Sequence, residues 1–453
     1  MAGHAPSRPR PPAAAPKRDN APGLAARRLA ADVIDEVLRA RTALEETFER
    51  LLPASGLDAA DAGLARAIAV TAFRRLGTIQ HAIDERLDRG SPRQSGPFEP
   101  ILTVAAAQIL FLDVPDHAAV DLAIRHLHED ARSARYAALG NAVLRRLVRE
   151  RDQVLAETAA DAFRDTPDWL AESWSETYGA EAAAAIAASH RDEPPLDITV
   201  KADPARWAEA LDGIALPTGS VRLRERQAIA ELPGFEDGEW WVQDAAAALP
   251  VKLLAPRPGE RIADLCAAPG GKTAQIAAAG ASATALDRSA PRLRRLKANL
   301  ARLGLSADIV TADAASWKSE PFDAVLLDAP CSATGTIRRH PDVAWAKLPE
   351  DRDRLASLQA RLLDAAAALT KPGGRLVYCT CSLEPEEGEG QIAGFLARHP
   401  QFRREPVTAA EIGGLAEAID ANGDIRTLPH QLKGENPRLS GWAGFYASRL
   451  IRL

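Results

Sequence analysis

The amino-acid sequence predicts a multidomain chain that combines an all-α bundle, a small α+β insert and a doubly wound α/β domain. Apolar residues recur with the helical period from about Leu24 to Glu150, which is the pattern of packed amphipathic helices. Short strand-like runs then flank a helical stretch near Trp207, and from Pro258 onward strands and helices alternate. A chain of 453 residues is too long for one hydrophobic core, so we expect separate domains.

The composition is that of a globular protein in a reducing compartment. The hydrophobic fraction of 46% is ordinary, and the net charge of -6 argues against a uniformly basic coat for nucleic acid while leaving room for a local basic channel. All 4 cysteines lie beyond residue 260 and do not form a disulfide framework. No apolar run of about 18 residues is present, so we expect no membrane partner and a cytoplasmic location.

Residues 1–22 are rich in proline, alanine and arginine and nearly free of acidic residues. Prolines occupy the positions where a secretory signal needs an apolar core, so secretion is not expected. We interpret this segment as a disordered basic tail, with an organelle transit peptide as the alternative.

The helical bundle is predicted for residues 23–153. Its central helix is Ile101–Leu112, which is apolar on nearly all sides and is interrupted at Pro115. The last helix, residues 139–151, carries an arginine cluster, which is typically a solvated face but in a helical module can also contact phosphates. The cluster consists of Arg145, Arg146, Arg149 and Arg151.

A linker helix and a small α+β subdomain are predicted for residues 154–256. Trp169 and Trp174 lie in the linker helix, and we interpret them as packing residues rather than as base-stacking ones. Asp197–Val200 and Val221–Leu223 are the predicted strands of the insert.

The α/β domain is predicted for residues 257–453. Its alternating pattern indicates a doubly wound parallel sheet, and such sheets place ligands at the C-terminal ends of their strands. The predicted strands are Arg261–Leu265, Ala283–Asp287, Asp308–Ala312, Ala324–Asp328, Arg375–Cys379 and Gly444–Leu450.

A glycine-rich turn, DLCAAPGGKT at Asp264–Thr273, follows the first of these strands. Gly270 and Gly271 allow the backbone to turn tightly and approach a ligand, and the next helix offers free N–H groups. The end of the turn is like that of a phosphate-binding P-loop, but Cys266 stands where that motif needs glycine. The pattern GxGxxG of nicotinamide-binding folds is also missing, so the turn favours a different nucleotide-like ligand.

Aspartates end three successive strands. Asp287 is placed to accept hydrogen bonds from two ribose hydroxyls, and Asp313 is suited to an adenine amino group, while Asp328 ends the strand beyond. Each aspartate alone is more often a strand-end cap. Together with the glycine-rich turn, the three predict an adenosine-containing cofactor.

Two cysteines complete the pattern: Asp328-Ala-Pro-Cys331 and Thr380-Cys381-Ser382 each follow a strand. With these motifs, the region from PGFEDGEWWVQDAAA at 233–247 to the last strand resembles the RsmB (Fmu/Sun) family of S-adenosylmethionine-dependent RNA cytosine-5 methyltransferases. The resemblance implies a Rossmann-like class I methyltransferase domain with S-adenosylmethionine as its cofactor.

The helical bundle resembles the NusB-like RNA-binding domain. The residues that carry this likeness are Arg74-Arg75, AAAQILFLDVPDHAAVDLAI at 105–124 and GNAVLRRL at 140–147. The resemblance implies RNA as the partner, with 16S rRNA as the favoured substrate, and we expect a monomer.

The same resemblance assigns roles to individual residues. Cys381 would be the nucleophile, Cys331 would assist product release, and Asp328 would stabilise the base while also contacting the cofactor. The implied cofactor contacts are Cys266, Ala267, Ala268, Pro269, Gly270, Gly271, Lys272, Asp287, Asp313 and Asp328.

The chemistry explains why thiols are needed. Carbon 5 of cytosine is too weak a nucleophile to attack a sulfonium methyl, so a thiolate first adds to carbon 6 and creates an enamine. A thiol titrates near about 8.5 in the absence of other charges, so nearby cations help. Lys272, Arg338 and Arg339 are the candidates. Arg338, Arg339 and His340 are also candidate phosphate contacts, although a solvated turn explains them equally well.

Alternatives concern the other thiols and the choice of nucleophile. DNA cytosine-5 enzymes use the Pro-Cys cysteine and the RNA family uses the Thr-Cys cysteine, so the presence of both favours Cys381. We interpret Cys266 as structural and Cys379 as a buried small residue on the strand face opposite Cys381. The spacings lack paired C-x-x-C, so no metal is expected.

Two rival functions remain: a tRNA cytosine-5 methyltransferase, and a non-catalytic RNA-binding factor, against which intact Cys331, Cys381 and Asp328 argue. An amino-methyltransferase would need Asn/Asp-Pro-Pro-Tyr at 328–331, which this chain lacks. Two stretches depart from the family pattern: ITVKA at 198–202, and Trp442-Ala-Gly-Phe445, where the usual acidic residue before the glycine is missing.

Overall fold

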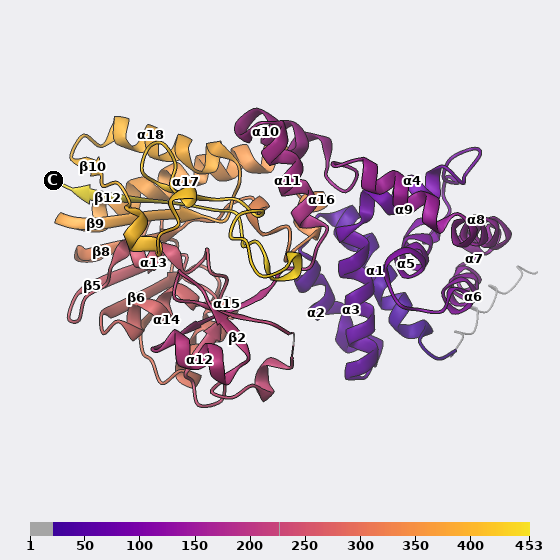
Figure 1. Cartoon of the computed structure of the whole chain (residues 1–453), viewed down its shortest axis with the longest axis horizontal. Helices are drawn as coiled ribbons and strands as arrows, with labels where there is room; N and C mark the ends of the chain where they lie inside the picture. The colour runs from indigo at the N-terminus through magenta and orange to yellow at the C-terminus, as the bar shows by residue number, and fades with distance from the viewer. Residues whose placement is uncertain (1–20, 226) are drawn as a thin grey trace, which may run out of the picture. The chain divides into compact units, whose positions relative to one another are not determined.

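The computed structural model describes residues 21–225 and 227–453. It divides into two compact units, residues 1–161 and 162–453, which are treated separately here (Figure 1). The predicted basic tail, residues 1–22, lies almost wholly outside the described residues. No helix in the described ranges is both long enough and apolar enough to cross a membrane.

The first unit is a bundle built around α5 (Phe98–Phe111), in agreement with the predicted central helix. Eleven of the residues of α5 are buried, and the helix contacts α1, α3, α6 and α8. This burial on all sides explains its continuous apolar sequence. The other helices are α1 (Leu24–Ala40), α2 (Leu44–Ser55), α3 (Ala59–Arg74), α4 (Leu76–Asp84), α6 (Asp116–Leu127), α7 (Ala131–Ala134), α8 (Ala137–Arg149) and α9 (Arg151–Ala160).

The second unit begins with a helical pair, α10 (Asp168–Tyr178) and α11 (Ala180–His190). Trp174 of α10 is fully buried, and its Nε1 donates a hydrogen bond to Glu384 Oε1 at 3.1 Å. The prediction that Trp174 is a packing residue is therefore confirmed.

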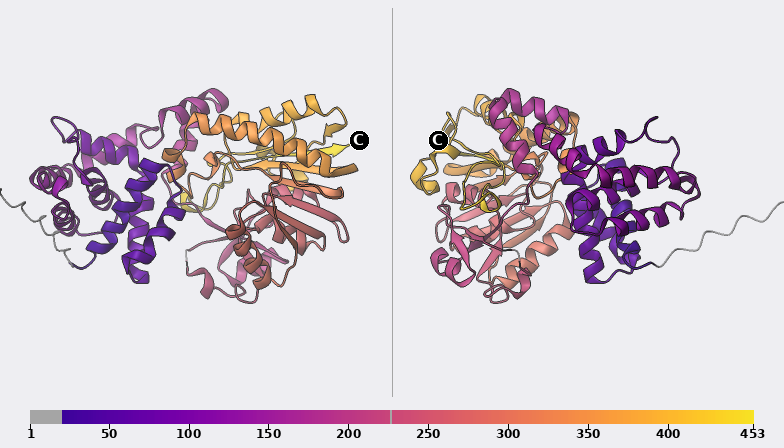
Figure 2. Two further views of the ribbon diagram at one scale, coloured as in Figure 1. Left: turned by 180° about the vertical axis from the view of Figure 1, so that it is seen from behind. Right: turned by 45° about the vertical axis from the view of Figure 1, so that its right-hand side comes forward.

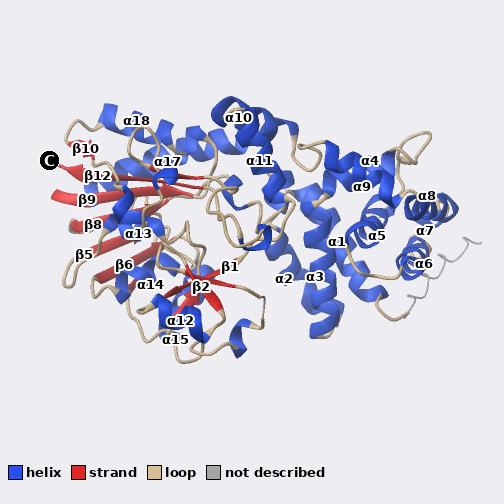
Figure 3. Ribbon diagram, in the orientation of Figure 1, coloured by secondary structure: helices blue, strands red, loops and turns tan. Residues whose placement is uncertain are grey.

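The insert is a four-stranded antiparallel sheet in the order β2-β3-β1-β4 (Figure 3). Its strands are β1 (Leu196–Val200), β2 (Gly213–Ala215), β3 (Val221–Leu223) and β4 (Trp240–Val242), and α12 (Pro204–Ala210) covers them. The sequence predicts β1 and β3 but misses β2 and β4; β2, β3 and β4 have three residues each, which is too short for an alternating pattern to identify them reliably. Ile198, Trp207 and Trp240 form its core.

The main sheet has eight strands in the order β10-β12-β9-β8-β5-β6-β7, with β11 paired to β12. The strands from β9 to β7 are parallel, as predicted, but β12 pairs antiparallel with β9 and with β10. The prediction of a wholly parallel sheet is wrong at this edge, because a loop rather than a crossover helix leads into β12. The bounds are β5 (Arg261–Leu265), β6 (Ser282–Asp287), β7 (Asp308–Thr311), β8 (Phe322–Asp328), β9 (Thr370–Thr380), β10 (Phe402–Arg404), β11 (Ile425–Thr427) and β12 (Phe445–Arg452).

Helices cover both faces of this sheet, which confirms the doubly wound α/β class (Figure 1, Figure 2). Alternate strand residues serve opposite faces: Val325 and Leu376 pack with α17 and α18, while Leu326 and Val377 pack with α13. The helices are α13 (Leu249–Leu254), α14 (Gly271–Ala278), α15 (Ala290–Arg302), α16 (Asp342–Ala346), α17 (Pro349–Leu369) and α18 (Glu389–Arg398). Short 3-10 turns are η1 (Ile229–Glu231), η2 (Thr334–Thr336), η3 (Pro385–Glu387), η4 (Ala409–Ile412), η5 (Ala416–Ala418) and η6 (Pro437–Leu439).

Candidate active site

The C-terminal ends of the parallel strands meet at one edge of the main sheet. Leu265 of β5 is in register with Leu286 of β6 and Leu327 of β8, and Asp328 is in register with Cys379 of β9. The residues that follow these strands are therefore neighbours in space, although more than a hundred residues separate the first from the last.

The glycine-rich turn joins β5 to α14 and requires glycine at position 270. Gly270 has a φ of 106°, in the region that favours glycine, and a Cβ there would lie 2.7 Å from Leu296 Cγ of α15. Cys266 also has a positive φ, of 63°. The turn thus presses its backbone against α15 and leaves the N-terminus of α14 at the sheet edge.

Asp287, at the end of β6, is buried and engaged with the backbone. Its Oδ2 accepts a hydrogen bond from Ala268 N at 3.3 Å, and its Oδ1 accepts one from Ser289 N at 2.8 Å. These contacts tie the glycine-rich turn to the start of α15. A carboxylate oxygen can accept two hydrogen bonds, so Oδ1 retains room for one more donor.

Asp313, beyond β7, is exposed and accepts a hydrogen bond from Ala315 N at 2.9 Å. This is an Asx turn, the structural role that any single strand-end aspartate can have. Its predicted contact with an adenine amino group stays a prediction.

Lys272 and Asp328 form an ion pair across the sheet edge. Lys272 Nζ donates to Asp328 Oδ2 at 2.7 Å and lies 5.0 Å from the centre of the Phe445 ring. Burial alone would lower the pKa of Lys272, but the charge and hydrogen bond of Asp328, together with Cys379 and Asp264, outweigh this effect, and the pKa is raised above its ordinary value. Lys272 therefore stays charged and fixes the direction of the Asp328 side chain.

Asp264 lies beneath the turn and is fully buried. Thr273 Oγ1 donates to its Oδ2 at 2.6 Å, and its Oδ1 has no hydrogen-bond partner in the described part of the chain. Burial raises the pKa of Asp264 to about 7. Neither the burial nor the raised pKa of Asp264 can be predicted from the sequence, because an aspartate at a strand end can be either solvated or enclosed.

The two predicted reactive thiols are in contact. Cys331 follows β8, Cys381 follows β9, and their Sγ atoms are 3.5 Å apart although 50 residues separate them in the chain. Both are free and partly accessible. The hydrogen bond to Cys381, burial, and the negative charges of Cys381 and Glu387 raise the pKa of the Cys331 thiol well above its ordinary value. Cys331 therefore holds its proton more strongly than an isolated thiol does.

The other two cysteines do not join the thiol pair, and only Cys379 is buried. Burial raises the pKa of Cys266 to about 12, and Cys379 is fully buried with its Sγ 3.5 Å from Asp328 Oδ1. The expectation that Cys379 faces away from Cys381 is wrong: both pack against the same hydrophobic cluster, because residues two apart in a strand share a face.

Arg338 does not fit its predicted contact with RNA. Its guanidinium is buried and donates to the carbonyl oxygens of Ser440, at 2.6 Å, and Glu193, at 3.0 Å. Arg339 forms an ion pair with Asp244 at 2.9 Å. Asp244, which follows β4, also accepts a hydrogen bond at its Oδ1 from Ala443 N at 3.2 Å. Its carboxylate therefore contacts the stretch 442–445, where the usual acidic residue of the family is missing.

Sequence reasoning missed Glu387. The sequence predicts that Glu386 and Glu387 lie in the first turn of a helix, where their charges match the helix dipole. In the structure η3 ends at Glu387, α18 begins later, and the Glu387 side chain is fully buried against the Cys331 loop. No local pattern distinguishes a buried glutamate from a capping one.

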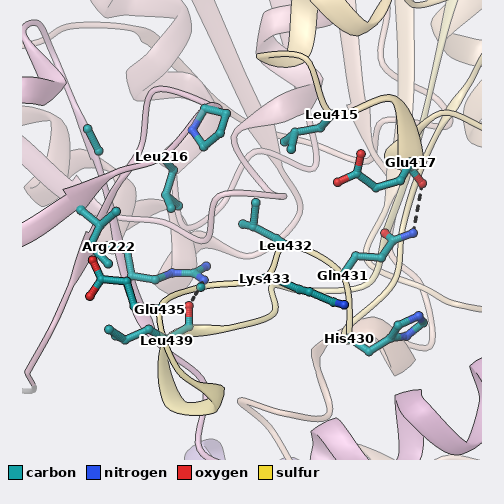
Figure 4. Close-up of a pocket in the computed structure, with 14 residues that line it drawn as sticks. Leu216, Arg222, Leu415, Glu417, His430, Gln431, Leu432, Lys433, Glu435 and Leu439 are labelled. Carbon is teal, nitrogen blue, oxygen red and sulfur yellow. Dashed lines mark hydrogen bonds between the residues drawn. The ribbon is translucent and has the colours of Figure 1, made fainter.

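A separate cavity of about 740 Å³ lies elsewhere in the second unit (Figure 4). Its walls come from the end of β2 and from the segment between β11 and β12, and Arg222 closes one side by donating to Leu439 O at 2.7 Å. None of the predicted site residues is among the described residues that line it. We therefore place the candidate active site at the thiol pair and the glycine-rich turn.

Comparison with known proteins identifies the family of the chain. A family model described as 16S rRNA methyltransferase RsmB/F matches residues 251–450, and the NusB family model matches residues 24–149. Ribosomal RNA small subunit methyltransferase B of Cronobacter sakazakii is 34% identical over 444 residues, covering 94% of this chain and 98% of the relative. The chain belongs to the RsmB/F family of 16S rRNA methyltransferases.

Another RsmB relative, from Xylella fastidiosa, is 37% identical over 446 residues, covering 95% of this chain and 98% of the relative. The fold is also that of the crystal structure of PH0851, at a TM-score of 0.71 and 24% identity, covering 96% of this chain and 100% of that chain. A methyltransferase homolog from Pyrococcus horikoshii is 27% identical with a TM-score of 0.51, covering 62% of this chain and 94% of that one.

Family membership confirms the resemblance predicted from the DAPC and TCS motifs and from the NusB-like bundle. It also confirms the Rossmann-like class of the RsmB/F domain. Within the described ranges, no group of three or more histidine, cysteine, aspartate or glutamate side chains is arranged to hold a metal ion.

Proposed function

We propose that this RsmB/F protein transfers a methyl group from S-adenosylmethionine to carbon 5 of a cytosine in 16S rRNA, through a covalent bond between Cys381 and carbon 6. The observation that carries the proposal is the contact between the Cys331 and Cys381 sulfur atoms, 3.5 Å apart at the sheet edge. Nucleophilic attack alone needs only one thiol, whereas addition followed by elimination can use two.

The residues at the sheet edge fit the cofactor. The turn at residues 266–271 leads directly into α14, whose N-terminus offers free N–H groups, and Asp287 Oδ1 has capacity for a ribose hydroxyl. Asp313 is exposed and available to an adenine amino group. When bound, S-adenosylmethionine supplies an electrophilic methyl group on a sulfonium.

The protein groups then divide the chemistry. Cys381, as a thiolate, adds to carbon 6 of the base. Asp328, held by Lys272, stabilises the addition at the N3 edge. Carbon 5 of the resulting enamine accepts the methyl group. A base, either the Cys331 thiolate or water, takes the carbon 5 proton as the Cys381 thiolate departs, and we assign Cys331 to this release step.

The RNA assignment rests on the family and on the NusB match. A cytosine must leave its stack before a thiol can reach carbon 6, so the substrate is unstacked or single-stranded RNA at the target. The protein acts as a monomer in the cytoplasm in this proposal. A tRNA cytosine is the alternative target.

Bisulfite mapping of ribosomal and transfer RNA, from cells with and without the gene, tests the proposal. We expect one cytosine of 16S rRNA to lose its protection from conversion when the gene is removed and to regain it on complementation. Loss of protection only in tRNA would replace the substrate, and no change in either RNA would overturn the proposed activity.

A further inference from the structure

Glu387 is a fully buried carboxylate that takes no part in the reaction as described above. Its carboxylate oxygens accept hydrogen bonds from Ser332 N, at 2.9 and 3.1 Å, from Ser332 Oγ, and from Gln359 Nε2 at 3.0 Å. Ser332 directly follows Cys331. Every recorded donor to this carboxylate is neutral, so its position depends on hydrogen bonds rather than on an ion pair within the described residues.

The same hydrogen bonds hold both sides of Cys331. Gln359 Nε2, which donates to Glu387, also donates to Pro330 O at 2.9 Å. The backbone before Cys331 and the backbone after it are thus anchored to one buried pair, Gln359 and Glu387. These hydrogen bonds fix the loop that carries Cys331.

The Glu387 main chain meets the other cysteine segment. Its carbonyl oxygen accepts hydrogen bonds from Tyr378 Oη at 2.7 Å and from Thr380 Oγ1 at 3.2 Å. Both residues are among the last three of β9, directly before Cys381. Ser332 Oγ lies 3.1 Å from Ser382 Oγ, so the residues that follow the two cysteines are also in contact. One residue therefore connects the two segments that carry the thiols.

We propose that Glu387 is a positioning residue for the thiol pair: its carboxylate fixes the Cys331 loop and its carbonyl group fixes the end of β9, which keeps the two sulfur atoms in contact. The consequence for methyl transfer rests on the proposed function, whereas the effect on the thiols does not. The charge of Glu387 contributes to the raised pKa of Cys331, so the same residue also helps to keep that thiol protonated.

The thiol pair can be tested without substrate. In glutathione buffers, oxidised glutathione accepts two electrons and two protons as the Cys331–Cys381 disulfide forms, and two reduced glutathione molecules result. The equilibrium gives an effective concentration of one thiol at the other, read by mass spectrometry after alkylation. This quantity measures positioning, and a general loss of stability that leaves the loop in place does not change it.

The variants are made in the full chain. Glu387→Ala should lower the effective concentration by roughly tenfold or more, since buried hydrogen bonds to a charged group are lost. Glu387→Gln keeps the size and one of the two acceptor oxygens, and its amide NH2 can donate to Ser332 Oγ, so the effective concentration should stay within about threefold of the parent. Loss of the negative charge should lower the pKa of Cys331, measured as the pH dependence of its alkylation. Glu386→Ala is the matched control, because Glu386 lies on the same turn, is exposed, and pairs with Arg352 at 2.9 Å.

An unchanged effective concentration in Glu387→Ala, relative to Glu386→Ala, would overturn the proposal. If Glu387→Ala does not fold, Ser332→Ala decides: it removes one donor to Glu387 and the contact to Ser382, and a decrease supports the proposal while no change refutes it. With RNA, we expect kcat to fall and KM to stay constant. Absence of methylation by the parent protein would defeat the proposed function alone, since the thiol equilibrium remains measurable.

Discussion

The two halves of the sheet edge hold their polar groups in different ways. At β5 to β7, Asp287 and Asp313 are held by nearby backbone: Asp287 binds Ser289 N and Asp313 binds Ala315 N, each two residues on. At β8 and β9, the contacts join distant segments, such as Cys331 with Cys381 and Ser332 with Glu387, 55 residues apart. The first half is built from local turns, and the second from tertiary contacts that place reactive groups together.

This difference predicts what a substitution in each half should disrupt. A change at β8 or β9 should remove chemistry and leave the fold, whereas a change in the turns of β5 to β7 should disturb the backbone that receives a cofactor. The variants below separate these outcomes, beginning with the largest expected effect.

Cys381→Ala should reduce methyl transfer by roughly a thousandfold or more, because the covalent route is lost entirely. The measurement is incorporation of labelled methyl into 16S rRNA. Cys379→Ala serves as a comparison for thermal stability, since Cys379 is buried in β9, two residues before Cys381. Residual methylation by Cys381→Ala near the parent rate would show that another group attacks the base.

Lys272→Met should reduce kcat by about a hundredfold, since a misplaced catalytic group costs this much. Without the ammonium at 2.7 Å, Asp328 loses its fixed direction. The measurement is single-turnover methylation, with cofactor binding followed separately by calorimetry. A variant that bound the cofactor more weakly but reached the parent single-turnover rate at saturating cofactor would assign Lys272 to cofactor binding rather than to the orientation of Asp328.

The sequence predicts the local half of the site better than the tertiary half. Glycines, strand-end aspartates and the strand pattern identify the turn at Gly270 and the position of Asp287, because each depends on residues close in the chain. The strand pattern placed Cys331 and Cys381 after strands at the same edge of the sheet, and the family resemblance assigned their roles. Glu387 was missed because its partners, Ser332 and Gln359, come from other elements. The strand β12 was predicted, but its antiparallel orientation was not, because its partner β9 is distant in the chain.

Gly270→Ala should destabilise the protein by about 3 kcal/mol, through left-handed strain and crowding against Leu296. Gly304→Ala is a matched control, since Gly304 also has a positive φ, of 61°, but nothing lies within 4 Å of its Cβ position. Chemical denaturation of both variants isolates the crowding. Equal losses in the two would mean that the contact with Leu296 contributes nothing.

Asp264 gives the smallest effect, visible only as pH dependence. Its folded pKa, about 7, is raised above the unfolded value of 3.8. Its contribution to stability is thus complete below the unfolded pKa and is lost as the pH rises through the folded pKa. Asp264→Asn lacks this loss, so its stability relative to the parent should rise by about 2 kcal/mol between roughly pH 5 and pH 7. A difference that is constant with pH would contradict the raised pKa.

The central claim is that one thiol attacks and the other releases. The direct measurement is denaturing gel electrophoresis of Cys331→Ala after incubation with S-adenosylmethionine and 16S rRNA. We predict a covalent protein–RNA adduct that accumulates with Cys331→Ala, is absent with Cys381→Ala, and is absent when both cysteines are replaced. Normal turnover by Cys331→Ala with no adduct would contradict the account.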